Sequence, residues 1–217
     1  MEILYLDNKI IVCVKPGGVL STDESGGMPG LLREALGDPA AAIYTVHRLD
    51  AAVGGLMVYA RTRHAAGDLG RAIMNGGFRK TYLAVLRGIP GEKEAVLRSW
   101  LLRDTRRGVT KAVPGPEPGA KEAELAYRIL DEREGLSLTE IRLRTGRTHQ
   151  IRCQFAARGL PLWGDRKYGS REEGSIALWS HRLAFTHPAT GEALDFRLAP
   201  PRDDPWTLFE EALWKQN

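Results

Sequence analysis

The sequence predicts an α+β fold, in which a mixed sheet carries helices and loops packed on it. Strand patterns dominate the chain of 217 residues, and only a few helical patterns interrupt them. The clearest strand covers residues 78–87, where the period of two places Lys80 and Tyr82 on the same face. The clearest helix covers residues 64–75 and ends at Gly76. Strands that outnumber helices without alternating regularly with them indicate the α+β class.

Short elements are predicted for the first sixty residues. Asp7-Asn8-Lys9 has turn composition and separates the first two strands, while Gly37 is placed to end a helix. A Pro/Gly bend that begins at Pro16 leads towards a segment that is a loop by composition. The expected elements are strands at 2–6 and 10–15, a loop at 21–30, a helix at 31–36, and strands at 44–50 and 55–60.

A long basic loop is predicted for residues 103–120. Basic side chains surround a Pro/Gly run at 113–119. Such a segment is either a solvated connection or a mobile arm that contacts phosphates, and composition alone leaves both open. The strands expected after it are at 123–130, 136–143, 176–186 and 193–198.

The last predicted helix covers residues 149–158. Thr148 is the expected N-cap, and Gly159 is the expected end of the helix. Ile151 and Phe155, four residues apart, would lie on the face that turns towards the core.

Composition indicates one globular, cytoplasmic domain over residues 1–217. Apolar residues make up 43% and charged residues 27%, which is an ordinary balance. No apolar run approaches the roughly 20 residues that span a bilayer, and the N-terminus lacks the basic region of a signal peptide. We therefore expect no membrane partner. Cys13 and Cys153 each lie in an apolar segment, which fits buried, reduced thiols.

The charge balance is mildly basic. The net charge is +4, and 23 of the 31 basic residues are arginine, whose planar fork suits phosphates and bases. A genome-wide preference for arginine gives the same count, so charge alone suggests nucleic acid only weakly. No Cys and His residues have zinc-like spacing, and we therefore expect no metal.

Asp50 is the acidic residue that most needs a physical explanation. It follows the basic pair His47-Arg48 and precedes a stretch of small residues and an apolar strand. An acid in that position must be solvated, paired or used in chemistry. Taken alone, Asp50 fits a helix cap or an ion pair as well as catalysis, and Tyr82 and Arg152 also have ordinary structural explanations.

Four segments, taken together and in order, resemble the signature of the RluA-type pseudouridine synthases. They are His47-Arg48-Leu49-Asp50, Arg79-Lys80-Thr81-Tyr82-Leu83-Ala84-Val85, Thr145-Gly146-Arg147-Thr148-His149-Gln150-Ile151-Arg152 and Gly164-Asp165-Arg166-Lys167-Tyr168-Gly169. The third is similar almost letter for letter to the family's motif. Residues 15–19 and 187–192 also fit, so the resemblance spans roughly residues 7–200. It implies the pseudouridine synthase fold, with a largely antiparallel central sheet.

One departure from the family pattern follows Asp50. The family usually has Thr-Ser-Gly where this chain has Val53-Gly54-Gly55, so two hydroxyl groups are lost. Hydrogen bonds that those hydroxyls give to the loop must then come from the backbone or from water. Many relatives also carry an N-terminal S4-type RNA-binding domain, for which we expect no room in this chain.

The resemblance implies isomerisation of uridine to pseudouridine in ribosomal or transfer RNA. The N1–C1′ bond breaks, the uracil turns, and C5 joins C1′. The reaction is redox-neutral and the family uses neither cofactor nor metal. Asp50 would act at the sugar, either by attacking C1′ or by removing a sugar proton. Arg152 would pair with Asp50 and keep it ionised, and Tyr82 would stack on the uracil and assist proton removal at C5.

Further residues are implied in binding the RNA. Base flipping costs a few kcal/mol of stacking and pairing, and Arg48 resembles the residue that fills the gap left by the base. His47 and His149 would shape the site or contact RNA. Arg147 and Gln150 complete the expected RNA contacts.

Two other interpretations compete with a synthase. A catalytically silent RNA-binding module of the same fold is supported only by Val53-Gly54. An unrelated hydrolase would use Asp50 and His149 as an acid–base pair, but the sequence lacks a nucleophile elbow, a second paired carboxylate and a metal-ligand set. The sequence does not identify the target uridine, and we expect a monomer.

Overall fold

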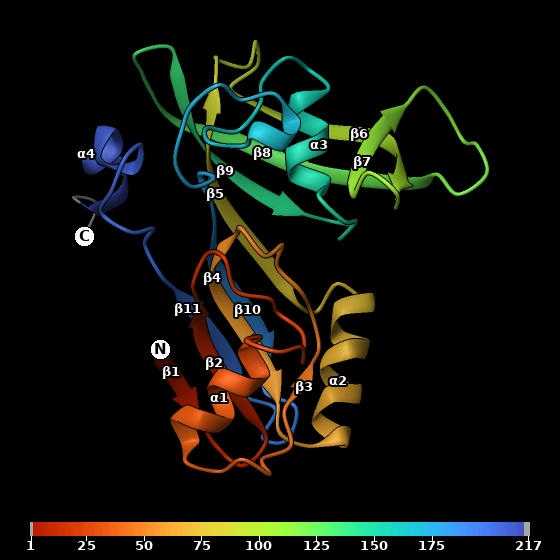
Figure 1. Cartoon of the computed structure of the whole chain (residues 1–217), viewed down its shortest axis with the longest axis vertical. Coiled ribbons are helices and arrows are strands. Elements are labelled where there is room, and N and C mark those ends of the chain that lie inside the picture. The colour runs from red at the N-terminus through yellow and green to blue at the C-terminus, as the bar shows by residue number, and fades with distance from the viewer. Residues whose placement is uncertain (1, 215–217) are drawn as a thin grey trace. The chain divides into compact units, whose positions relative to one another are not determined.

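The computed structural model describes residues 2–214 and confirms the predicted α+β class, with largely antiparallel strands (Figure 1). The chain divides into two compact units. Unit 1 comprises the residues up to Lys80 together with Ser180–Leu198, and unit 2 comprises Thr81–Trp179 together with the described residues from Ala199 onward. A single domain over the whole chain stays a prediction.

Unit 1 is built on a sheet with the strand order β1-β2-β4-β10, in which β3 pairs with β4 and β11 with β10. The pairs β1–β2, β2–β4, β3–β4 and β10–β11 are antiparallel. Five predicted strands and both predicted helices of this part of the chain are confirmed to within a few residues. The elements are β1 (Ile3–Leu6), β2 (Ile10–Lys15), α1 (Met28–Leu36), β3 (Tyr44–Thr45), β4 (Gly54–Ala60), α2 (Arg63–Met74), β10 (Leu178–Thr186) and β11 (Ala193–Arg197).

The core of unit 1 lies between its sheet and α2. Thr62 caps α2 by accepting a hydrogen bond from the Ala65 N–H at 3.1 Å, and the apolar stripe of the helix then faces the sheet. Phe78 stacks on Phe185 with ring centroids 5.0 Å apart. Full burial of one such side chain stabilises the fold by about 1.5–3 kcal/mol. The buried cluster consists of Ile10, Val12, Leu56, Val58, Ala60, Ala65, Leu69, Phe78, Leu183 and Phe185.

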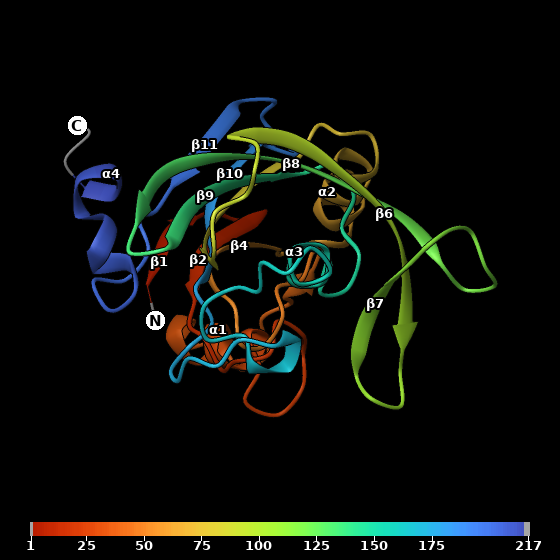
Figure 2. The same ribbon diagram turned by 90° about the horizontal axis from the view of Figure 1, so that it is seen from above.

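Unit 2 is an antiparallel sheet with the strand order β5-β9-β8-β6-β7. Figure 2 shows the β6–β7 hairpin at the end of this sheet, beside α3. The predicted strands at 78–87, 123–130 and 136–143 are confirmed. The elements are β5 (Arg79–Arg87), β6 (Glu94–Asp104), β7 (Val109–Val113), β8 (Lys121–Arg133), β9 (Leu136–Leu143), α3 (Gln150–Ala156), the 3-10 turns Arg166–Tyr168 and Trp206–Phe209, and α4 (Glu210–Trp214).

Three predicted elements are wrong in extent. The strand predicted at 44–50 ends at Thr45. The loop predicted at 103–120 is mostly the β6–β7 hairpin, and only the Pro-rich part after Val113 is irregular. The last helix begins at Gln150, after His149 in the left-handed conformation (φ 53°), and Thr148 does not cap it.

The two cysteines are confirmed as buried free thiols. Burial raises the pKa of Cys13 to about 12 and that of Cys153 to about 11, so both stay protonated near neutral pH. Among the helices of residues 2–214, none combines the length and the apolar character needed to cross a membrane.

Candidate active site

The loop that carries Asp50 is fixed by hydrogen bonds within unit 1. Asp50 is half-buried, and its carbonyl accepts from the Val53 N–H at 3.0 Å, which closes a tight turn. The buried Ser21 hydroxyl donates to the Leu49 carbonyl at 2.9 Å and accepts from the Leu49 N–H at 3.0 Å. The backbone is therefore held on both sides of the carboxylate.

Lys15 is a site residue that the sequence did not single out. Its side chain is fully buried, and its ammonium donates to three carbonyl oxygens: Pro16 at 2.8 Å, Val19 at 2.6 Å and Ala51 at 2.9 Å. Burial lowers the pKa of Lys15 to about 8, and the charge of Asp50 opposes that shift. The ammonium thus joins the end of β2 to the residue directly after Asp50. A lysine at the end of an apolar strand was the available signal.

Titration of Lys15 is expected to change stability at alkaline pH. Its pKa in the folded protein, about 8, lies below the ordinary value of 10.5, so the unfolded chain binds more protons between those two pH values. The free energy of unfolding contributed by this group therefore rises with pH across that window, by up to about 3 kcal/mol. Urea denaturation at several pH values, compared with Lys15→Met, measures the difference. If the free energy of unfolding depends on pH in the same way in both proteins, the lowered pKa of Lys15 is contradicted.

His47 and Arg48 point to different environments. His47 is buried, and its Nε2 accepts from the Val58 N–H of β4 at 3.2 Å. Its ring lies 5.4 Å from that of Phe78, and burial, aided by the charge of Lys80, lowers the pKa of His47 to about 3. Neutral His47 therefore braces the loop. Arg48 is exposed.

Packing explains Val53, where the chain departs from the family pattern, and Gly55, where it keeps the family's glycine. Val53 is 2% exposed and belongs to the core, so an apolar side chain replaces the family's hydroxyl in a dry place. Gly55 has φ +116°, and a Cβ there would lie 2.5 Å from the Ser180 carbonyl oxygen. Only glycine fits this close approach of two backbones.

Gly55→Ala is therefore expected to destabilise the protein strongly. The added Cβ collides with backbone that cannot move aside, and the positive φ adds strain, for a combined cost of about 3 kcal/mol or more. Chemical denaturation measures this loss. Gly70→Ala is the matched control, because Gly70 lies in α2 with open space around it, and alanine there is expected to add up to about 1 kcal/mol. Equal stabilities of the two variants would contradict the close approach.

Tyr82 lies on β5, opposite Ile141 of β9, and is 5% exposed. Lys80 precedes it by two residues on the same face, as the strand period predicts. The Lys80 ammonium lies 5.6 Å from the centroid of Phe78, and burial lowers the pKa of Lys80. A phenol ring and a cation thus stand at the start of β5.

Arg152 forms a buried ion pair within unit 2. Its Nε donates to Asp165 Oδ2 and its Nη2 to Asp165 Oδ1, both at 2.7 Å, and the two side chains are 7% and 1% exposed. The guanidinium also lies 5.0 Å from the ring centroid of Tyr168. This bidentate arrangement fixes the plane of the guanidinium. The sequence did not identify Asp165 as a partner, although it lies in the fourth motif. The pairing of Arg152 with Asp50 stays a prediction.

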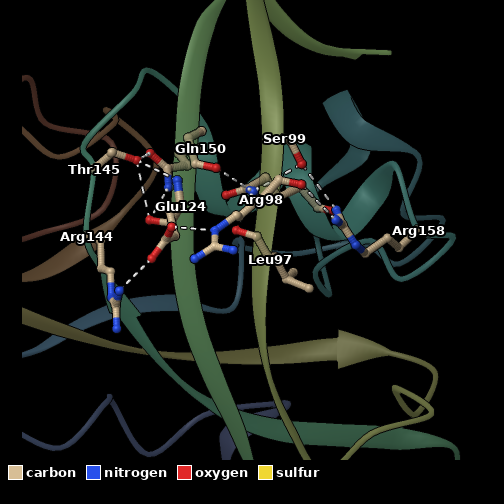
Figure 3. Close-up of polar contacts among 10 residues, drawn as sticks. Leu97, Arg98, Ser99, Glu124, Arg144, Thr145, Gln150 and Arg158 are labelled. Atoms are coloured by element: carbon tan, nitrogen blue, oxygen red, sulfur yellow. Dashed lines mark hydrogen bonds and ion pairs between the residues drawn. The ribbon is translucent and has the colours of Figure 1, made fainter. Parts of the chain in front are cut away.

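The segment before α3 is organised by Gln150. Its buried Oε1 accepts from the Thr145 hydroxyl at 2.8 Å and from the Arg147 N–H at 2.9 Å, and its Nε2 donates to the Glu124 carbonyl at 3.1 Å. Through these contacts the Gln150 side-chain amide holds the loop of residues 145–149 in place (Figure 3). Arg147 is exposed, and His149 Nδ1 lies 2.9 Å from the Tyr168 hydroxyl. The structure therefore favours a positioning role for Gln150, while its RNA contact stays a prediction.

Within residues 2–214, no three His, Cys, Asp or Glu side chains are grouped so that they could hold a metal ion.

Comparison with known proteins identifies the family. A family model described as RNA pseudouridylate synthase matches residues 9–157, more than half of the chain. The chain is 30% identical over 213 residues to "Uncharacterized RNA pseudouridine synthase YhcT" of Bacillus subtilis, covering 94% of this chain and 70% of that protein. It is 32% identical over 230 residues to ribosomal large subunit pseudouridine synthase D of Neisseria meningitidis serogroup A. That match covers 96% of this chain and 60% of the Neisseria protein.

A solved structure, human RNA pseudouridylate synthase domain containing 1, has the same fold. The TM-score is 0.78 at 23% identity, and the match covers 94% of this chain and 85% of the human one. The sequence resemblance drawn from the four motifs is thereby confirmed. The chain belongs to the RNA pseudouridylate synthase family and is an RluA-type RNA pseudouridine synthase, an isomerase.

Proposed function

We propose that this protein converts specific uridines of structured RNA to pseudouridine with Asp50 as the carboxylate that acts at the sugar. The N1–C1′ bond breaks, the uracil rotates and the C5–C1′ bond forms, after which the proton on C5 is released to solvent and N1 takes up a proton in its place. Atoms and electrons balance without an oxidant or reductant. The observation that carries the proposal is the half-buried carboxylate on a loop that Lys15 and Ser21 hold rigid. Fixed geometry at the reacting group is what such a displacement requires.

Arg152 and Tyr82 complete the proposed chemistry. Either role of Asp50, attack at C1′ or removal of a sugar proton, needs an ionised carboxylate in a site that excludes water. An adjacent guanidinium favours the ionised form, and Arg152 is the cation proposed for this. The bidentate contact with Asp165 supports the proposal, because it fixes the direction in which the remaining N–H donors of Arg152 point. Tyr82 is proposed to stack on the flipped uracil.

The residues proposed to contact RNA differ in how exposed their side chains are. Arg48 and Arg147 are exposed, which supports a wedge at the site of base flipping for Arg48 and a phosphate contact for Arg147. His149 is half-buried and lies two residues after Arg147. For His47 and Gln150 the burial favours positioning, and in our proposal they act through the loops that carry Asp50 and Arg147.

Release of tritium from C5 of labelled uridine tests the proposed reaction directly. The purified protein is mixed with ribosomal RNA or transfer RNA transcribed with that label, and turnover frees one tritium for each pseudouridine formed. Several similar proteins are named for the large ribosomal subunit, so ribosomal RNA is the first substrate to test. Mapping pseudouridine in cells with and without the protein then locates the target. No release from any cellular RNA would favour the silent RNA-binding module.

Tyr82→Phe is expected to keep RNA binding and to lower turnover by about 10²-fold, because phenylalanine retains the stacking ring and loses the hydroxyl proposed to assist proton removal. Single-turnover tritium release measures the rate, and a gel-shift assay measures the binding. A rate equal to that of the unmodified protein would remove the hydroxyl from the mechanism.

A further inference from the structure

Ser21 lies in the loop between β2 and α1 and takes the place of a strand partner for Leu49. Its buried hydroxyl donates to the Leu49 carbonyl at 2.9 Å and accepts from the Leu49 N–H at 3.0 Å. In a sheet, a residue of the neighbouring strand makes both contacts, but β3 ends at Thr45, before Leu49 is reached. One side chain therefore satisfies both backbone groups of the residue directly before Asp50.

Tyr59 of β4 fixes the backbone of Ser21. The Tyr59 side chain is 0% exposed, and its hydroxyl donates to the Ser21 carbonyl at 2.9 Å. Thr45, the cross-strand partner of Tyr59, donates to the same carbonyl at the longer distance of 3.3 Å. Ser21 is thus attached to β4 through its carbonyl and to the Asp50 loop through its hydroxyl. A chain of hydrogen bonds runs from Tyr59 through Ser21 to Leu49.

The Tyr59 hydroxyl stays a hydrogen-bond donor near neutral pH. Burial raises the pKa of Tyr59 far above its ordinary value of 10.0, so the group remains protonated. Met57, which lies on the same face of β4, places its sulfur 3.4 Å from the Tyr59 oxygen. A thioether is a weak acceptor, whereas the Ser21 carbonyl is a strong one. The hydroxyl proton is therefore directed to Ser21.

Strand β4 holds the Asp50 loop at a second point. The Val58 N–H of β4 donates to His47 Nε2 at 3.2 Å. All 7 residues of β4 are buried, so the strand is a firm support for both attachments. The family pattern has two hydroxyls at positions 53 and 54 that this chain lacks, and the sequence suggested only the backbone or water in their place. In the structure, the hydroxyls of Ser21 and Tyr59 contribute to holding the loop.

We propose that Tyr59 and Ser21 are positioning residues for the isomerisation, which act on Asp50 through the backbone of Leu49. The proposal rests on the catalytic role proposed above for Asp50. A carboxylate that attacks C1′ or removes a sugar proton must be held within about 0.5 Å of its productive position. Loss of the Tyr59 hydroxyl changes neither the Asp50 side chain nor the residues proposed to contact RNA. The chemical step is therefore slowed while the binding of RNA is retained.

Tyr59→Phe is expected to lower kcat for tritium release about tenfold and to leave KM within about twofold, because the ring still fills its space and only the hydroxyl is lost. Tyr127→Phe is the matched control. That buried tyrosine donates to the Glu92 carbonyl at 3.1 Å in unit 2, so the same atom is removed. Both variants are expected to lower the midpoint of thermal unfolding by about 2–4 °C. Equal kcat values for the two variants would overturn the proposal.

Amide hydrogen exchange, followed by NMR, measures how firmly the loop is held without any assay of activity. Ser21→Ala removes the acceptor of the Leu49 N–H and is expected to raise the exchange rate of that amide at least about tenfold. Tyr59→Phe acts one step further away and is expected to raise it about threefold, whereas Tyr127→Phe leaves it unchanged. Exchange of the Leu49 amide at the rate of the unmodified protein in both Ser21→Ala and Tyr59→Phe would overturn the proposal.

Failure of the positioning role is distinguishable from failure of the proposed function. If the unmodified protein releases no tritium, the proposed function fails, and exchange of the Leu49 amide still tests whether Ser21 and Tyr59 hold the loop. In an active protein, Ser21→Ala is expected to lower kcat about 10²-fold with KM nearly unchanged. If Asp50→Asn abolishes tritium release while Ser21→Ala and Tyr59→Phe keep the kcat of Tyr127→Phe, Asp50 is catalytic and the positioning role is overturned.

Discussion

Asp50→Asn is expected to abolish pseudouridine formation while leaving a folded protein that binds RNA. Asparagine keeps the size and the hydrogen-bonding geometry of the side chain but removes the charge and the nucleophilic oxygen. Both proposed roles of Asp50 need that charge, so the rate of tritium release from labelled RNA is expected to fall by at least about 10³-fold. The midpoint of thermal unfolding is expected to change little, because backbone contacts of Leu49, Ala51 and Val53 hold the loop in either variant.

A second aspartate controls for the substitution itself. Asp38 is exposed in unit 1 and its carboxylate accepts only from a nearby backbone N–H, Ala40 at 3.0 Å, among the contacts described. Asp38→Asn is expected to release tritium at the rate of the unmodified protein. Turnover by Asp50→Asn at a comparable rate would remove Asp50 from the chemistry, whichever of its two roles is considered.

The strands that the sequence predicted best are those with long buried runs. β2, β4 and β5 have long buried runs bounded by turn residues, and their positions follow from that pattern. The β6–β7 hairpin was missed because only Leu97 and Leu101 of β6 are buried among exposed and half-buried residues, and β7 is a short edge strand with one buried residue, so the apolar period is weak. Its basic residues led to the prediction of a loop.

Two other errors have a tertiary cause. The strand predicted at 44–50 fails because the His47 ring, and not a neighbouring strand, takes the Val58 N–H of β4. Thr148 does not cap α3 because the left-handed backbone at His149 separates it from the helix, and the Thr148 carbonyl instead accepts from the Thr110 hydroxyl at 2.9 Å. Neither long-range contact leaves a trace in local composition.

The candidate site was predictable as a set of residues but not as a set of pairs. The motifs pointed to Asp50, Tyr82 and Arg152, because a family resemblance is detected from residue types at fixed spacing. The partners that hold them are distant in sequence and ordinary in type. Lys15 is 36 residues from Ala51, and Asp165 is 13 residues from Arg152. Only the fold shows that a buried ammonium contacts the Asp50 loop and that a buried carboxylate binds Arg152.

Arg152→Met is expected to destabilise the protein by about 3–5 kcal/mol, the largest loss of stability among the variants proposed. The Asp165 carboxylate would stay 1% exposed without the bidentate guanidinium that now binds both its oxygens at 2.7 Å. Asp165→Leu leaves Arg152 buried beside an apolar group and is expected to cost a similar amount. Urea denaturation measures both, and activity loss in either single variant is therefore ambiguous between misfolding and chemistry.

The double variant Arg152→Met/Asp165→Leu resolves that ambiguity. An apolar pair of similar volume leaves no buried charge unpaired, so most of the lost stability is expected to return and the two single costs are expected not to add. If Arg152 keeps Asp50 ionised, the refolded double variant still releases no tritium, because the cation is gone. If Arg152 serves only to neutralise Asp165, activity returns together with stability. Recovery of both stability and activity in the double variant would thus mean that another cation keeps Asp50 ionised. The buried Lys15 ammonium would then be the next candidate, because the charge of Asp50 raises its pKa.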